Sequence, residues 1–149
     1  MDRTLIATTH ATLLALDILS LDPGTSFCRG STISRVEILG VVTSRELKAG
    51  KFIKFAIDDG TGCVVCVLWL NHLSSPYFSR RDRSHCRVLA DVARQHSLEI
   101  RLGAAVRVRG RLTGYRGHVQ VTISDITGER NNPNVEILHW LECLRGTRR

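Results

Sequence analysis

The sequence FIKFAIDDGTGCVVCVLWL, residues 52–70, decides the fold. Its first part, FIKFAI, alternates between two sets of side chains, which is the period of a half-buried strand. DDGTG then supplies turn residues, with glycines that can take a positive φ. The final part, CVVCVLWL, is continuously apolar, as in a buried strand. This stretch therefore predicts a β-hairpin, with Ile53 and Phe55 facing inward and Phe52 and Lys54 facing outward.

Similar alternation occurs on both sides of this hairpin. Upstream, a strand is expected from Ile33 to about Val42, and residues 46–50 are expected to connect it to the hairpin. Downstream, residues 106–112 and 119–124 alternate around a glycine-containing loop at 114–118. The sequence thus predicts five strands, arranged as three, an insertion and then two.

Helices are expected in two other segments. In the insertion, residues 84–96, Ser84 is a candidate N-cap, and one helical face is expected to carry the apolar residues Val88, Leu89, Val92 and Ala93. Asn131-Asn132-Pro133 indicates the start of a terminal helix that runs through Arg145 and ends at Gly146. The apolar segment 11–21 fits a strand or a helix equally well.

Five strands with a helix between the third and fourth predict an OB-fold, an all-β Greek-key barrel with added helices. An SH3-like barrel would lack the inserted helix. We expect an N-terminal lead segment at 1–32 that packs on the barrel, the barrel itself at 33–128, and a C-terminal helix at 129–149.

The charge of the 149-residue chain favours a polyanionic partner. The net charge is +7, and residues 80–116 contain ten arginines against three acidic residues. A solvated basic surface is the simpler alternative. The odd number of cysteines, five, favours a reducing compartment, and no apolar stretch approaches the roughly 20 residues needed to span a membrane.

Catalytic, metal and cofactor sites are not expected. Cys63 and Cys66 are three positions apart in a strand pattern, so their sulfurs should point to opposite faces and cannot share a metal ion without distortion. The histidines are scattered, and no nucleophile elbow or phosphate-binding loop is present. We therefore expect a protein that is not an enzyme.

Binding of single-stranded nucleic acid requires cations along the backbone and flat rings for the bases. Strand period places Arg107, Arg109 and Arg111 on one face of the fourth strand. Trp69 ends the third strand, where core and outer face are equally compatible with the pattern. The candidate nucleic-acid-binding residues are Phe52, Lys54, Trp69, Arg107, Arg109, Arg111, Tyr115 and Arg116, the last two in the loop after the fourth strand.

Five short motifs, in order along the chain, resemble one known family. They are ISRVEILG at 33–40, IDDGTGC at 57–63, VLWLNH at 67–72, VRVRG at 106–110 and NVEILHWL at 134–141. This ordered set is similar to the Stn subunit of the telomere-capping CST complex, in the short form found in land plants. The likeness runs from about His10 to Arg145.

The resemblance implies an OB-fold related to the middle subunit of replication protein A. It also implies a nuclear location at telomeres of chromosomes and binding to telomeric single-stranded DNA. The partners implied are a small Ten subunit, a large Ctc subunit and polymerase α-primase during lagging-strand fill-in. Longer members of the family carry C-terminal winged-helix domains, so docking by those domains is expected to be absent or to fall to the barrel.

The terminal helix is a candidate partner surface. A polar strip is expected at Glu136, His139 and Glu142, with apolar residues around the rest of the cylinder. The surplus apolar area must lie under residues 11–21 or against another chain, and the resemblance implies contact with the Ten subunit. The candidate partner-binding residues are Ile137, Leu138, Trp140, Leu141 and Leu144.

Three functions remain as hypotheses from the sequence. The first is a single-stranded DNA-binding subunit at chromosome ends. The second is a structural bridge within the complex that makes little DNA contact of its own. The third is a generic replication or RNA-binding OB module.

Overall fold

The computed structural model describes residues 10–21, 27–28, 31–32, 34–78, 81–129 and 134–147. Five long strands form the barrel: β4 (Arg35–Lys48), β5 (Phe52–Asp58), β6 (Cys63–Trp69), β7 (Ala105–Tyr115) and β8 (His118–Gly128). The other described elements are β1 (Ala11–Thr12), α2 (Ala15–Leu19), β2 (Phe27–Cys28), β3 (Ser31–Thr32), η1 (Pro76–Phe78), α3 (Arg83–Ser97) and α4 (Val135–Thr147).

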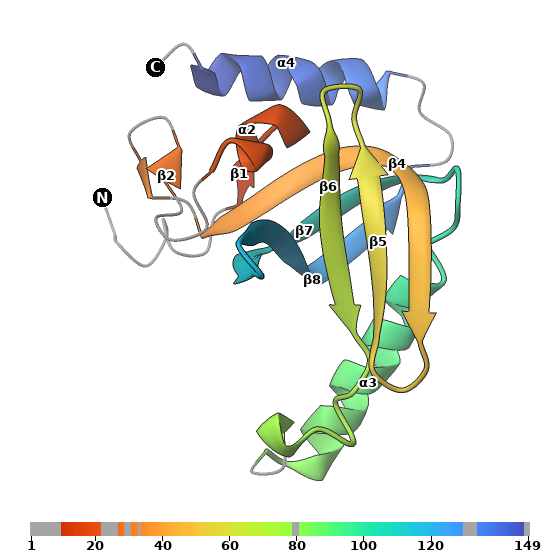
Figure 1. Ribbon diagram of the computed structural model, residues 1–149. Helices are drawn as coiled ribbons and strands as arrows, with labels where there is room; N and C mark the ends of the chain where they lie inside the picture. Colours follow the sequence, from red (N-terminus) through yellow and green to blue (C-terminus); the bar gives the residue numbers. More distant parts are fainter. Residues whose placement is uncertain are drawn as a thin grey trace.

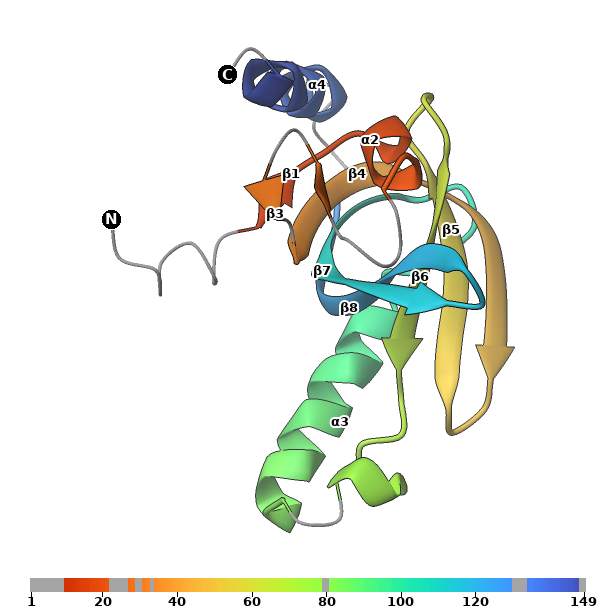
Figure 2. The same cartoon turned by 60° about the vertical axis from the view of Figure 1, so that its left-hand side comes forward.

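The five long strands close on themselves in the order β4-β5-β6-β8-β7, and β7 pairs back with β4. Neighbours are antiparallel except β6 and β8, which run parallel. The short β1 adds to β4 in parallel. This is the predicted OB-fold. α3 projects from one end of the barrel, and α4 lies across the other end (Figures 1 and 2).

The predicted alternation places the core inside the barrel. Ile53, Phe55 and Ile57 of β5 are almost fully buried, whereas Phe52 and Lys54 on the other face are partly exposed. Two glycines allow neighbouring strands to approach closely. A Cβ on Gly110 would clash with the Thr122 carbonyl oxygen on β8, and one on Gly40 would lie 2.8 Å from the Asp58 carbonyl oxygen.

The strands extend further than the sequence indicated. β4 continues through Lys48, so the expected connection at 46–50 is reduced to a short turn after that residue. A bulge between Val42 and Ser44 lets this long strand bend from one partner to the other. β7 likewise continues through Tyr115, which leaves only Arg116 and Gly117 to turn into β8.

The inserted helix forms as expected, but its cap and its buried face differ from the prediction. Asp82, not Ser84, is the N-cap of α3, and its carboxylate accepts a hydrogen bond from the Ser84 backbone N–H at 3.1 Å. Cys86 and Ala93 are buried, whereas Val88 and Val92 are exposed. The face predicted from the apolar periodicity is therefore wrong for Val88 and Val92, because much of α3 projects beyond the barrel (Figure 2).

The segment 11–21, left open by the sequence, contains both a strand and a helix. Ala11 and Thr12 form β1, and α2 follows with Ile18 fully buried. The start of α2 is held by the turn between β5 and β6. The buried Asp59 carboxylate accepts a hydrogen bond from the Ala15 N–H at 2.8 Å, and the Thr61 hydroxyl accepts one from the Leu16 N–H at 3.0 Å. The DDGTG turn therefore caps a helix that lies more than 40 residues earlier in the chain.

We expect Asp59→Ala to lower the free energy of unfolding by about 1–3 kcal/mol, because the Ala15 N–H and the Thr61 N–H would both lose their acceptor. Urea denaturation would measure the change. Asp58→Ala is the matched control, since Asp58 accepts only a local hydrogen bond from the exposed Gly60 N–H. Equal losses in the two variants would contradict a capping role for Asp59.

Candidate nucleic-acid interface

The outer face of the β5–β6 hairpin carries two aromatic rings in contact. Phe52 and Trp69 are opposite each other in the β5–β6 register, with ring centroids 5.6 Å apart and planes at 75°. Trp69 is 39% exposed, which answers the question that the sequence left open: the indole lies on the outer face of the barrel and not in the core. An exposed, supported ring of this kind can stack on a nucleobase.

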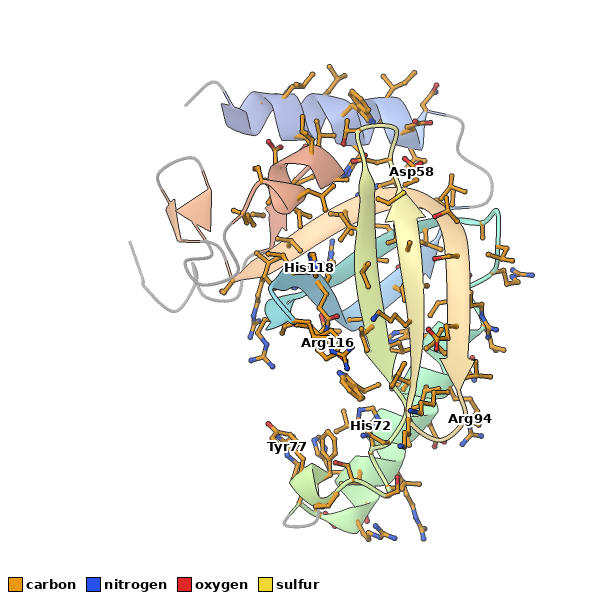
Figure 3. The ribbon with its side chains drawn as sticks, viewed as in Figure 1. Asp58, His72, Tyr77, Arg94, Arg116 and His118 are labelled. Carbon is orange, nitrogen blue, oxygen red and sulfur yellow. The ribbon has the colours of Figure 1, made fainter. Side chains whose placement is uncertain are left out.

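The tip of the β7–β8 hairpin lies beside these rings. Tyr115 is the last residue of β7 and not a loop residue, and Arg116 and Gly117 turn the chain with φ of 51° and 79°. The Lys54 ammonium lies 5.1 Å from the centroid of the Tyr115 ring, and the Arg116 guanidinium lies 5.2 Å from it. Figure 3 shows Arg116 and His118 together at this tip.

These contacts form two groups, the Phe52–Trp69 pair and Tyr115 with its two cations, and they are linked because Phe52 and Lys54 share one face of β5. The two groups together are called the ring cluster: Phe52, Lys54, Trp69, Tyr115 and Arg116. All five residues were predicted from the sequence, but Lys48 was not, and its ammonium lies 6.0 Å from the centroid of the Phe52 ring. A compositional signal was available, because all three lysines of the chain fall between residues 48 and 54. The cluster combines flat rings with cations on one surface.

Arg107 and Arg109 belong to a different cluster. They share the predicted face of β7, but there they meet acidic residues. Arg109 Nε lies 2.7 Å from Glu37 Oε1, and Arg107 Nε lies 3.0 Å from Glu129 Oε1. Arg107 also lies 3.6 Å from the second Glu37 oxygen. Carboxylates of Glu37 on β4 and Glu129 just after β8 therefore balance the charges of these two arginines. Their contact with phosphate stays a prediction, and a phosphate would have to compete with these ion pairs.

Glu37 is held in its charged form by this arrangement. Partial burial alone would raise the pKa of Glu37, but the hydrogen bond from Arg109 and the charges of Arg109 and Arg107 lower it below its usual value. The Thr12 hydroxyl of β1 donates a further hydrogen bond to Glu37 at 3.3 Å. Glu37 on β4 thus links β1, through Thr12, to β7, through Arg107 and Arg109.

Arg111, the third arginine of this face, is exposed and lies opposite Arg35 in the β4–β7 register.

α4 presents an apolar face to solvent. Ile137, Leu138, Leu141 and Leu144 are each at least 46% exposed. His139, expected on a polar strip, is instead buried against the barrel together with Cys143, and their Nε2 and Sγ atoms are 3.5 Å apart. Trp140 is half-buried and lies near Gly60 of the β5–β6 turn, so it contacts the barrel of its own chain.

The comparisons agree with this geometry. The family model described as "OB-fold nucleic acid binding domain" matches residues 36–127. The protein named CST complex subunit STN1 from Arabidopsis thaliana is 51% identical over 97% of this chain and 92% of its own length. The chain belongs to the STN1 family of CST complex subunits. This membership confirms the family suggested by the five motifs, and it agrees with the expectation of a non-enzymatic protein.

Two further relatives define the extent of the match. The STN1 subunit from Ailuropoda melanoleuca is 30% identical over 85% of this chain, which spans only 37% of that longer protein. The solved structure of the S. pombe Stn1–Ten1 complex superposes with a TM-score of 0.73 at 17% sequence identity, covering 95% of this chain and 93% of that one. The structural similarity to the S. pombe protein shows that the two chains share a fold.

Neither a metal site nor a membrane-spanning helix was predicted from the sequence. Within the described ranges, no group of three or more His, Cys, Asp or Glu side chains could hold a metal ion. Cys63 is exposed and Cys66 is buried, so the two sulfurs are on opposite faces as expected, and burial raises the pKa of the Cys66 thiol. The same part of the chain contains no helix that is long and apolar enough to cross a membrane.

We expect the protein to lose stability as the pH falls below about 6.5, in part because of His139. Burial, followed by the charge of Arg107, lowers the pKa of His139 in the folded state. The unfolded chain then binds more protons than the folded chain, so acidification favours unfolding. Urea denaturation between pH 7.5 and about pH 5 would show a weaker pH dependence in His139→Gln.

Replacement of the exposed His118 by Gln is the matched control for that measurement. The absolute stability of His139→Gln also reflects lost packing, so the informative quantity is the slope of the unfolding free energy against pH. Identical slopes in the wild type and in His139→Gln would contradict the assignment.

Proposed function

We propose that this STN1-family subunit binds single-stranded DNA at chromosome ends through the ring cluster. The observation that carries the proposal is the contact of Phe52 with Trp69 beside Tyr115, with Lys54 and Arg116 over the Tyr115 ring. Rings accept unpaired bases by stacking, and the cations lie where a phosphate backbone could follow the bases. Telomeric DNA as the ligand and a nuclear location are part of the proposal, and membership of a CST subunit family supports them.

Single-stranded rather than duplex DNA fits this surface. Bases in a duplex are already stacked on each other and cannot offer their faces to Trp69 or Tyr115. Stacking tolerates every base, so the cluster by itself gives little sequence preference. The ring cluster therefore supports general recognition of single strands, with any preference for telomeric sequence arising from contacts beyond stacking.

The test is a titration of the full chain with G-rich telomeric, scrambled and duplex oligonucleotides at several salt concentrations. We expect tighter binding to single strands, and we expect Trp69→Ala to weaken that binding by about 1–3 kcal/mol. If Arg116 neutralises one phosphate, Arg116→Ala reduces the magnitude of the slope of log K against log salt by about 0.7.

Arg109→Ala is the matched control, because Arg109 is paired with Glu37 and lies outside the ring cluster. We expect its slope to equal that of the wild type. Binding with no preference for single strands over duplex would contradict the proposal and favour a structural bridge that leaves DNA contact to another subunit.

We further propose that α4 docks the small Ten subunit. Its four exposed apolar side chains form a surface that a soluble protein normally covers, and the solved S. pombe relative is a Stn1–Ten1 complex. In a CST complex the large Ctc subunit is the other expected partner. Contact with polymerase α-primase remains a prediction from the resemblance alone.

We expect replacement of Leu141 and Leu144 by Ala to weaken binding of the Ten subunit by about 2 kcal/mol or more per residue, if these leucines lie at the centre of the interface. Trp140 is less suitable for this test because it also contacts the β5–β6 turn. Val88→Ala with Val92→Ala is the control, since these side chains are exposed on α3. Isothermal calorimetry with unchanged affinity in the α4 variant would exclude this surface.

A further inference from the structure

Residues 70–78, which follow β6 and are called the connector below, are supported by hydrogen bonds. The Asn71 carbonyl accepts hydrogen bonds from the Ser74 and Ser75 N–H groups at 3.2 and 2.9 Å. Arg83, in the first turn of α3, donates to the Leu73 carbonyl at 2.9 Å. These hydrogen bonds hold the residues that precede η1, although η1 lies outside the barrel.

The Phe78 ring of η1 contacts two other rings and a cation. Phe78 is half-buried, with the His72 and Tyr77 rings each 4.9 Å from it and the Arg81 guanidinium 5.6 Å from its centroid. The Cys86 thiol donates a weak hydrogen bond to the Phe78 carbonyl at 3.7 Å. Tyr77 is the outermost ring and is 75% exposed. A single exposed tyrosine is ordinary, but this one is held edge-on against a ring that is anchored beneath it.

Tyr77 follows the ring cluster closely along the chain. Trp69 ends β6, and the connector begins directly after it. Tyr77 lies on the same side of the molecule as Arg116 and His118 (Figure 3). Arg81 adds a cation beside the Phe78 ring. A single strand that leaves Trp69 toward η1 would therefore meet a further ring and a further cation.

We propose that Tyr77 is an additional stacking platform, which extends the path of single-stranded nucleic acid from the ring cluster onto the connector before α3. The inference rests on the proposed function, because an extension has no meaning unless the ring cluster binds single strands. It adds a residue and a direction: the strand runs from Tyr115 across Trp69 and toward η1. The ring, rather than the phenol hydroxyl, is the binding element.

The experiment measures affinity against oligonucleotide length with the full chain. OB-fold site sizes are about 4–16 nucleotides, so oligothymidines from about 4 to about 16 nucleotides cover both the ring cluster alone and the extended path. Tyr77→Ala, Tyr77→Phe and Trp69→Ala are compared with the wild type. Circular dichroism checks that each variant is folded. Because Tyr77 is exposed, its replacement is expected to leave the fold intact.

Tyr77→Ala is expected to bind the shortest oligothymidine as the wild type does, and to bind the longest at least about fivefold more weakly. Tyr77→Phe should match the wild type at every length, whereas Trp69→Ala should lose affinity at every length. Equal affinities of Tyr77→Ala and the wild type for the longest oligothymidine would overturn the extension and leave the proposed function intact. An equal loss at every length would also overturn it. No binding by the wild type would overturn the proposed function and this inference with it.

Discussion

The structure depends on one strand, β4, that pairs in succession with two other strands of the barrel. β4 pairs with β7 through residues 35–41 and with β5 through residues 41–48, and a bulge follows Val42, just after the change of partner. This double pairing closes the barrel, and closure brings the β7–β8 tip over the outer face of β5 and β6. Lys54 of β5 can reach the Tyr115 ring only because of that closure. The ring cluster is therefore a consequence of how β4 bends, and its side chains come from a packed scaffold instead of a long loop.

The arginines show why charge in the sequence overstates charge at a site. Arg107 and Arg109 alternate with buried valines and appear free in the sequence, yet they meet Glu37 and Glu129, which are far from them in the chain. Ion pairs between residues distant in sequence cannot be read from local pattern. Arg116 differs because it occupies a turn with positive φ, which places its guanidinium over Tyr115. The position of Arg116 therefore depends on the turn, which the density of arginines in the sequence does not reveal.

The sequence predicted what depends on local period and left open what depends on packing. Strand alternation identified the five strands, the inward set of β5 and the opposite faces of Cys63 and Cys66, because each rests on a period of two. It assigned the faces of the helices in part wrongly, since Val88 and Val92 are exposed and His139 is buried. α4 is apolar around most of its cylinder, so periodicity could not show that His139 and Cys143 face the barrel. The Asp59 cap was missed for the same reason, since a turn motif does not reveal a helix N-terminus from another part of the chain.

One hairpin connects the two proposed binding surfaces. Phe52 and Trp69 lie at one end of β5–β6, and the turn at the other end caps α2 and lies beside Trp140 of α4. Seven residues of β5 separate the ends by about 20 Å. The inner face of the hairpin is fully packed, and a packed barrel interior deforms little. A partner on α4 and a nucleic acid on the ring cluster would therefore share a rigid support without competing for side chains. Replacements on one surface are therefore expected to leave the other surface intact.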